Sequence, residues 1–261
     1  DIVAFTIAPT APRIGSLVGT WPRFRGAGFL GPDYFDRLTA IDEDATPAGQ
    51  LDDLGSFAHR TFDPARVAAA IREFYERTSR YDLHVTPHWR FPFRTGGRVF
   101  AWFARRFLGQ LELPTRPEGR EVVTTRLFGL RAELDGRERP RGYVRTYGAG
   151  ATARANYVAA YATHRAPGRL LLSCAFPLPF ACFVGVLRFD DGDRPGALTV
   201  TSRPRAGEGP SDEGLFLVTR FGALRLPLDE RIDVWLDEDG GAIAARHGVR
   251  LLGLPVFTLD Y

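Results

Sequence analysis

Residues 156–189 read NYVAAYATHRAPGRLLLSCAFPLPFACFVGVLRF, and this stretch decides the fold. It divides into three short, largely apolar runs. Pro167–Gly168 separates the first two runs, and a proline-rich segment around Leu178 separates the last two. Short runs rich in apolar and aromatic residues, bounded by turn residues, predict β-strands joined by hairpins. Three consecutive antiparallel strands are therefore expected here.

The same pattern continues on both sides of this stretch, from Glu121 to the end of the chain. Ten strands are expected, near Val122–Arg131, Gly142–Tyr147, Asn156–His164, Arg169–Phe176, Phe183–Phe189, Ala197–Ser202, Leu215–Phe221, Ile232–Leu236, Ala242–Leu251 and Val256–Tyr261. Alanine density in Ala151–His164 also permits a helix, and strand is favoured there. Because no helical pattern separates the strands, we expect a strongly bent or barrel-like antiparallel meander.

Helical signals occur only before Glu121. Asp63 is a suitable N-cap and Pro64 suits the first helical position, so a helix is expected from there to about Ser79. A second helix is expected from Thr95 to about Leu108. The segment between them contains Pro87 and is predicted to be extended.

The expected organisation is a single α+β domain, mainly antiparallel β. It comprises an irregular N-terminal arm (residues 1–60), a helical segment (61–115) and the sheet (116–261). With 28 Gly and 19 Pro in 261 residues, the composition favours short strands and many turns.

Missing residue types exclude several chemistries. All 34 basic residues are arginine. Without lysine the chain cannot form a Schiff base, anchor pyridoxal phosphate or supply the lysine of a phosphate-binding loop. Gly26–Gly31 matches a dinucleotide fingerprint only as a string, because Pro32 follows it directly. His84 and His88 lack further ligands nearby, so no metal and no cofactor is expected.

Charge and cysteine content suggest where the chain works. A net charge of +3 is too small to indicate a nucleic-acid partner. Two cysteines and no secretory leader pattern predict a reducing, cytoplasmic location. Cys174 and Cys182 flank a palindrome centred on Leu178, so the sulfurs would face each other if the chain reversed there. Two buried thiols are the favoured interpretation.

Strand alternation brings polar side chains onto common faces. Tyr143, Arg145 and Tyr147 share one face of their strand, and Tyr157 and Tyr161 share a face of the next. An arginine facing an apolar cavity can hold a carboxylate or enolate, while tyrosines donate hydrogen bonds. The alternative is a tyrosine–arginine ladder on a solvated face.

His247 interrupts the apolar stripe of the segment Ile243–Leu251. In an apolar cavity its pKa would shift and it could exchange protons, so we assign it the role of acid or base. Arg145 would then anchor an anion, with Tyr143 and Tyr147 as donors. A core histidine with a satisfied hydrogen bond is the alternative.

The segment Trp89–Phe107 holds seven aromatic residues and five arginines, with no acid. It suits a hydrophobic plug against the sheet, a lid over a cavity, or a surface that lies on an anionic membrane. As ligand-binding candidates we take Tyr157, Tyr161, Trp89, Phe93, Phe100, Trp102 and Phe103.

Together these features predict binding of a largely apolar small molecule between sheet and helices. If the protein is an enzyme, the expected chemistry is cofactor-independent proton transfer: cyclisation, isomerisation, hydration or dehydration. The alternatives are a non-catalytic carrier, a membrane-surface adaptor using residues 89–107, and an oligomerising structural protein.

Overall fold

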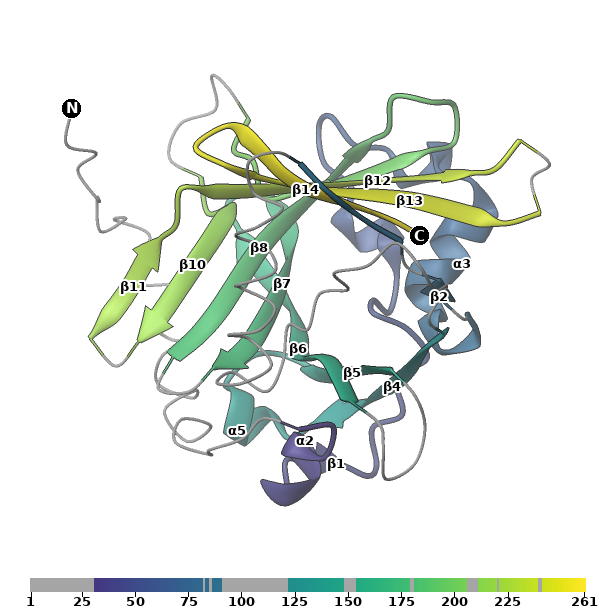
Figure 1. The fold of residues 1–261 in the computed structure, drawn as a ribbon. Helices are drawn as coiled ribbons and strands as arrows, with labels where there is room; N and C mark the ends of the chain where they lie inside the picture. Colours follow the sequence, from purple (N-terminus) through teal and green to yellow (C-terminus); the bar gives the residue numbers. More distant parts are fainter. Residues whose placement is uncertain are drawn as a thin grey trace, which may run out of the picture.

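The computed structural model describes residues 31–81, 83–84, 86–90, 122–147, 154–178, 181–205, 211–219, 221–238 and 241–261. Within these residues the protein is mainly antiparallel β, with a few short helices (Figure 1). This agrees with the predicted class.

The elements are mostly strands. The helices are α2 (Tyr34–Arg37), α3 (Ala69–Glu76) and α5 (Ala132–Asp135), and the 3-10 turns are η2 (Leu54–Phe57), η3 (Pro64–Arg66) and η4 (Thr78–Arg80). The strands are β1 (Ile41–Asp42), β2 (Leu83–His84), β3 (Thr86–Trp89), β4 (Val122–Leu130), β5 (Arg141–Tyr147), β6 (Arg154–Ala166), β7 (Arg169–Leu178), β8 (Ala181–Asp191), β9 (Leu198–Thr201), β10 (Gly214–Thr219), β11 (Gly222–Arg225), β12 (Leu228–Leu236), β13 (Ile243–Leu251) and β14 (Leu254–Asp260).

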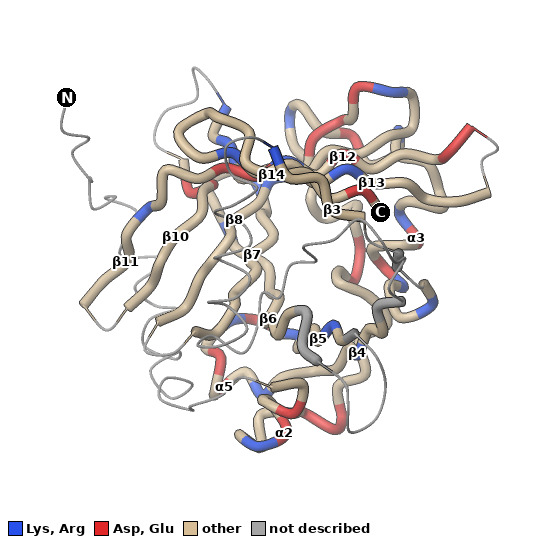
Figure 2. Tube along the Cα trace, viewed as in Figure 1, with Lys and Arg blue, Asp and Glu red and all other residues tan. Residues whose placement is uncertain are grey.

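These strands form one antiparallel sheet in the order β1-β4-β5-β6-β7-β8-β9-β12-β13-β14-β3. Most neighbours are consecutive in the chain, as expected of a meander. The β10–β11 hairpin is the departure, because β10 pairs with the first half of β8 while β9 pairs with its last residues. Figure 2 shows β7 and β10 almost without charged residues.

The sheet is neither closed nor strongly curled, so the predicted barrel-like curvature is wrong. β2 pairs with β4 near one end of the strand order, and β3 pairs with β14 at the other. These two short strands follow each other in the chain, yet the described residues contain no ladder that joins one to the other. Segments of two and four residues are too short to close the sheet.

Alternation along the strands gives the sheet two buried faces. We call them the α2-side core and the α3-side core, after the helix that covers each. The α2-side core includes Tyr34, Phe35, Phe128, Val144, Val158, Cys182, Val184 and Phe216. The α3-side core includes Ile71, Tyr75, Tyr143, Ala159, Tyr161, Cys174, Leu187, Phe189 and Val234.

α3 is shorter than the predicted helix. Asp63 does cap the first turn, since its side chain accepts from Ala65 N, and Pro64 occupies the first position as expected. The backbone then extends at Val67, and Ala68 N donates to Gly196 O at 2.9 Å. This bond to the β8–β9 turn prevents a continuous helix.

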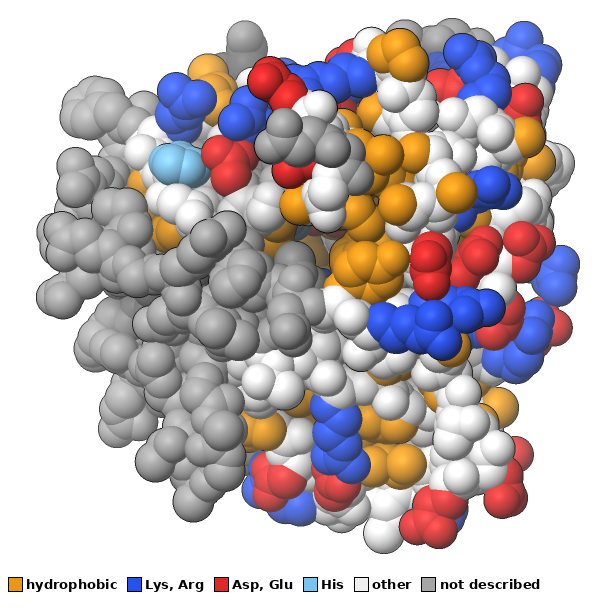
Figure 3. Space-filling view, turned by 90° about the vertical axis from the view of Figure 1, so that its right-hand side faces the viewer, with side chains coloured by type: hydrophobic (Ala, Val, Ile, Leu, Met, Phe, Trp, Pro, Cys, Tyr) orange, Lys and Arg blue, Asp and Glu red, His pale blue; other side chains and the backbone are white. Residues whose placement is uncertain are grey.

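Figure 3 shows the α3 side, where hydrophobic side chains reach the surface between charged ones.

The described part of the N-terminal arm is more ordered than expected, because α2 and η2 bury Tyr34, Phe35, Leu54 and Phe57. The predicted helix from Thr95 to Leu108 lies outside the described residues.

Each of the ten predicted strands has a counterpart, and residues 154–164, the described part of the doubtful segment, lie in a strand, β6. β11 was not expected, and β12 begins at Leu228 rather than Ile232.

The hairpin that joins β7 to β8 explains the two thiols. Its register pairs Cys174 with Gly185 and Cys182 with Pro177. The turn is therefore not centred on Leu178, and the two cysteines point to opposite faces of the sheet. Both are buried and outside any disulfide, as the favoured interpretation predicted.

Candidate functional site

A cluster of tyrosines around one arginine lies on the α3 side of β5 and β6. Tyr143 and Arg145 occupy alternate positions of β5, so both point to this side. Across the β5–β6 ladder, Arg145 lies opposite Tyr157. Tyr161 lies four residues after Tyr157 on β6, so it is on the same face, and it is opposite Cys174 of β7. The β5–β6 pairing thus places Tyr143, Arg145, Tyr157 and Tyr161 on one side of the sheet.

The guanidinium of Arg145 is held by aromatic side chains. Its Nη2 donates a 2.7 Å hydrogen bond to the Tyr143 hydroxyl. Its central carbon lies 4.9 Å from the centre of the Tyr143 ring and 5.2 Å from that of Tyr157. Contacts of this kind are cation–π interactions. Arg145 is only 7% exposed, and among the described residues no carboxylate forms an ion pair with it.

Two polar atoms beside this cluster lack hydrogen-bond partners among the described residues. They are Arg145 Nε and Thr125 Oγ1, and both are buried. Thr125 of β4 is the direct cross-strand neighbour of Arg145, so the two atoms lie on one face. Buried polar groups are nearly always satisfied in proteins. A buried N–H donor and a buried hydroxyl that both lack partners on the same face indicate a place for a polar group of a ligand or for a water.

The hydroxyls of Tyr157, Tyr161 and Tyr261 stay protonated at neutral pH. Burial raises the pKa of Tyr157 and of Tyr161 well above the ordinary value. Burial also raises the pKa of Tyr261 to about 12, although the charge of Arg145 acts in the opposite direction. Burial likewise raises the pKa of the Cys174 thiol. The cluster therefore offers one fixed positive charge and neutral hydroxyl donors, which suits an anion.

His247 is tied to a carboxylate that the sequence analysis missed. Its Nε2 lies 3.0 Å from Glu230 Oε2, and both side chains are largely buried. The negative charge of Glu230 raises the pKa values of Tyr261 and Cys174, so it acts on the same part of the core. Tyr261 in turn interacts electrostatically with Arg145. The charges of Glu230 and Arg145 thus act on Tyr261 in opposite directions.

A glycine makes room for this carboxylate. Glu230 Oε1 would lie 3.3 Å from a Cβ built on Gly185 of β8, which is the cross-strand neighbour of Cys174. Glu230 lies on β12, two residues before Ile232, and Ile232 is the cross-strand neighbour of His247 on β13. This position is the signal that could have identified Glu230. It was missed because β12 was expected to begin at Ile232. Thr125 and Tyr261 had no distinguishing pattern.

The remaining predicted residues are placed as follows. Trp89 packs on Phe257 of β14, with ring centres 5.1 Å apart. The backbone of Tyr147 belongs to β5, but its side chain is outside the described set. The other ligand-binding candidates, Phe93, Phe100, Trp102 and Phe103, lie outside the described residues.

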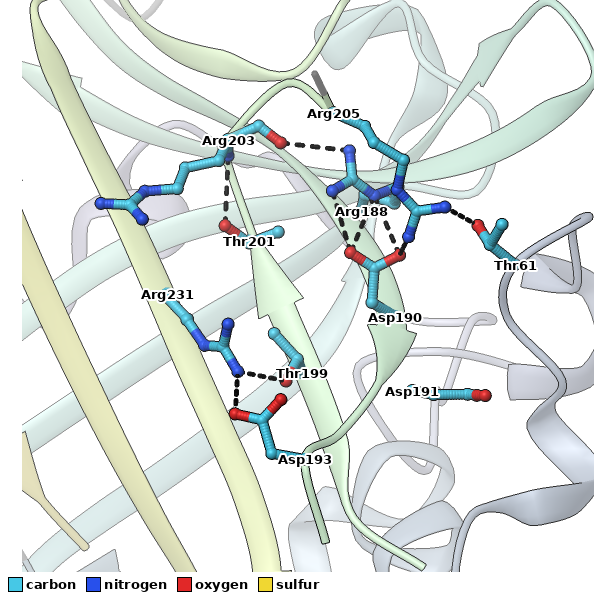
Figure 4. Close-up of a pocket in the computed structure, with 10 residues that line it drawn as sticks. All are labelled: Thr61, Arg188, Asp190, Asp191, Asp193, Thr199, Thr201, Arg203, Arg205 and Arg231. Carbon is cyan, nitrogen blue, oxygen red and sulfur yellow. Dashed lines mark hydrogen bonds and ion pairs between the residues drawn. The ribbon is translucent and has the colours of Figure 1, made fainter. Parts of the chain in front are cut away.

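A second candidate is a polar pocket over β8, β9 and β12, with a volume of about 360 Å³ (Figure 4). Its lining residues are Thr61, Arg188, Asp190, Asp191, Asp193, Thr199, Thr201, Arg203, Arg205 and Arg231. Arg188 donates to Asp190 and to Glu213, and Arg231 donates to Asp193 and Asp233.

The charges of this pocket compensate each other. Arg205 also bonds Asp190, at 2.8 Å, and Arg203 bonds Asp229. Networks of this kind hold loops and strand ends together, and each guanidinium already has an anionic partner. The pocket therefore lacks the uncompensated charge that marks the Arg145 cluster. No group of three or more His, Cys, Asp or Glu in the described ranges could hold a metal ion.

Comparison with known proteins gives one relative and no solved structure. The chain is 30% identical over all 261 residues to a protein of Bacillus subtilis (strain 168) named "Uncharacterized membrane protein YndJ". It spans 46% of that protein, or about half its length. No family model and no solved structure matches the chain. Within the described ranges, no helix is both long and apolar enough to cross a bilayer.

Proposed function

We propose that the chain binds a largely apolar small molecule that carries an anionic group, and that Arg145 holds this group. The anion would lie between Arg145 Nε and Thr125 Oγ1, and the apolar part would extend along the α3-side core. The observation that carries the proposal is the buried guanidinium whose Nε has no partner among the described residues.

Electrostatics supports this ligand class. A buried cation without an anion costs several kcal/mol of desolvation, and a bound carboxylate would offset part of this cost. The hydroxyls of Tyr157 and Tyr161 stay neutral, so they donate to an oxyanion rather than repel it. The surrounding side chains are aromatic, as in most small-molecule sites.

The proposal extends to catalysis if His247 transfers a proton to or from the bound ligand. Glu230 orients His247 through the 3.0 Å contact, in the way a carboxylate orients a catalytic histidine. With Arg145 holding an anionic or enolate oxygen, His247 would supply or remove the proton. Cyclisation, isomerisation, hydration and dehydration are the reaction classes that need only these groups.

Calorimetry with three ten-carbon probes tests the binding proposal. We expect decanoate to bind, and 1-decanol and decylamine to bind at least tenfold more weakly, because only decanoate pairs with the guanidinium. A hydrogen bond to a charged group contributes about 1.5–3 kcal/mol, which is roughly 10- to 150-fold in affinity.

The matched variants are Arg145→Met and Arg188→Met. Arg145→Met should abolish the preference for decanoate over decanol. Arg188→Met removes an arginine that bonds Asp190 and Glu213 and is not part of the tyrosine cluster, so the preference should remain. Equal affinity of the wild type for decanoate and decanol, or no binding of either, would contradict the proposal.

The relative's name supports a second proposal, that the chain works at a membrane surface. The match extends over every residue of the chain, and the relative is a membrane protein by name. Sedimentation with vesicles of phosphatidylcholine and phosphatidylglycerol in equal parts tests it. Binding that falls with salt supports this function, and absence of binding rejects it. A cytoplasmic location stays a prediction.

A further inference from the structure

The turn between β13 and β14 has two features that lower the stability of the folded protein, exposed leucine side chains and a strained backbone at Leu252. Leu252 and Leu254 are 63% and 61% exposed, two of the most exposed large apolar side chains in the described residues. Leu251 pairs with Leu254, so Leu252 and Gly253 form a two-residue hairpin loop. Exposed leucine at such a tip favours contact with another apolar surface.

The backbone of this turn is also unfavourable for leucine. Leu252 has φ +51° and Gly253 has φ +81°. Positive φ at both central residues is typical of a type I′ turn, for which asparagine–glycine is the preferred sequence. A leucine in the left-handed region is strained. Asparagine in its place would relieve the strain and remove the exposed apolar group.

A second leucine-rich segment lies beside the tip. Leu252 N donates to Pro227 O at 2.8 Å, and Leu228 pairs with Leu251 at the start of β12. We call the resulting surface the leucine corner. It consists of Leu226, Pro227, Leu228, Leu251, Leu252, Gly253, Leu254 and Pro255. The β13–β14 turn carries no charge in Figure 2.

Arginines border this corner on both segments. The exposed Arg250 precedes Leu251, whereas Arg225, which precedes Leu226, is half-buried and donates from Nη2 to Glu213 O at 2.6 Å. The nearest acid in either segment is Asp229, which already bonds Arg203 Nε at 2.5 Å. Exposed leucines at a turn with the exposed Arg250 directly behind them complement a bilayer that has anionic headgroups, because the leucines enter the acyl region while the arginine remains at the headgroups.

We propose that the leucine corner is the point at which this chain docks onto an anionic membrane surface, with Leu252 and Leu254 entering the bilayer. This inference rests on the proposed membrane-surface function and names the surface responsible. It replaces residues 89–107 as the docking element, and it is independent of ligand binding at Arg145.

The test uses the full chain, with Leu252→Asn and Leu252→Asn/Leu254→Thr as variants and Phe221→Asn as the matched control. Phe221 is 84% exposed in the β10–β11 turn, at the end of β11 away from the corner. The probe is vesicles of phosphatidylcholine and phosphatidylglycerol in equal parts, and each variant is also unfolded thermally.

We expect the double variant to sediment with vesicles at least about tenfold less than the wild type. Leu252→Asn should raise the melting temperature by roughly 2–4 °C, so loss of binding cannot come from unfolding. Phe221→Asn should bind as the wild type does, and pure phosphatidylcholine should bind the wild type more weakly.

Wild-type binding that the double variant retains would overturn the leucine corner while leaving the membrane-surface function in place. An equal loss in Phe221→Asn would overturn it as well, because any exposed apolar residue would then suffice. Self-association of the wild type that the double variant abolishes, without vesicle binding, would assign the corner to a second copy. No vesicle binding by the wild type would reject both proposals.

Discussion

Two buried arginines should respond in opposite ways to the same substitution. Arg137 and Arg145 are 8% and 7% exposed, so they are matched in burial. Arg137 donates to both carboxylate oxygens of Asp135, which is completely buried. Arg145 has a tyrosine hydroxyl and two aromatic rings as partners instead. Methionine replaces either side chain with an unbranched apolar one.

For Arg137→Met, the buried carboxylate of Asp135 loses its cation. Removing one partner of a buried ion pair costs about 3–5 kcal/mol of unfolding free energy. In a chain of this size, roughly 2–4 °C of melting temperature corresponds to each kcal/mol. We therefore expect the melting temperature to fall by roughly 6–20 °C.

For Arg145→Met, the losses and gains nearly cancel. The charged hydrogen bond contributes about 1.5–3 kcal/mol, and a desolvated cation–π contact about 2 kcal/mol. Removing an unpaired buried charge recovers several kcal/mol. Tyr143 keeps a partner, because Gln50 Nε2 lies 3.4 Å from its hydroxyl. The ligand-free variant should thus lie within about 1 kcal/mol of the wild type, or above it.

Urea denaturation of both variants, followed by circular dichroism, measures the difference. If Arg145→Met destabilised the protein as much as Arg137→Met does, then Arg145 would be a structural residue with a satisfied charge. The proposed anion site would then lose its physical basis.

Three further predictions concern packing, thiols and pH. Gly49→Ala should cost about 1–3 kcal/mol, because its Cβ would lie 2.2 Å from the backbone of α3, whereas Gly248→Ala in open space should be tolerated; chemical denaturation compares the two. The buried thiols Cys174 and Cys182 should resist Ellman's reagent in the native protein and both react after denaturation, and rapid native labelling of either would contradict its burial. The pKa of Tyr261 is higher in the folded protein (about 12) than in the unfolded chain (10.0), so stability should be intact below pH 10 and fall between these values; Tyr261→Phe should reduce the fall in alkaline denaturation curves.

The sequence predicted the strands well because each hairpin carries local turn signals. Alternation also placed Tyr143 and Arg145 on one face of their strand, and Tyr157 and Tyr161 on one face of the next, because side chains alternate within any strand. That the two pairs share one side follows from the β5–β6 register, which alternation alone does not give. The place of the β10–β11 hairpin could not be predicted in this way. Its pairing with β8 depends on which half of the long strand β8 is left unpaired by β9.

Long-range features could not be predicted. The partnership of Glu230 with His247 depends on β12 beginning at Leu228, where the sequence is mainly polar. The shortened α3 depends on a hydrogen bond from Ala68 to the β8–β9 turn. Curvature was overestimated because strand count alone does not close a sheet, and both edges of this one end in short strands.

The most direct test of the anion site is whether a ligand anion accepts a hydrogen bond from the Nε–H group of Arg145. In a nitrogen–proton correlation spectrum, the Nε–H signal of Arg145 can be assigned by its loss in Arg145→Met. We predict that decanoate shifts this signal in a saturable manner and slows its exchange with water, while 1-decanol does neither. An Nε–H signal that decanoate leaves unchanged at saturating concentration would contradict the account.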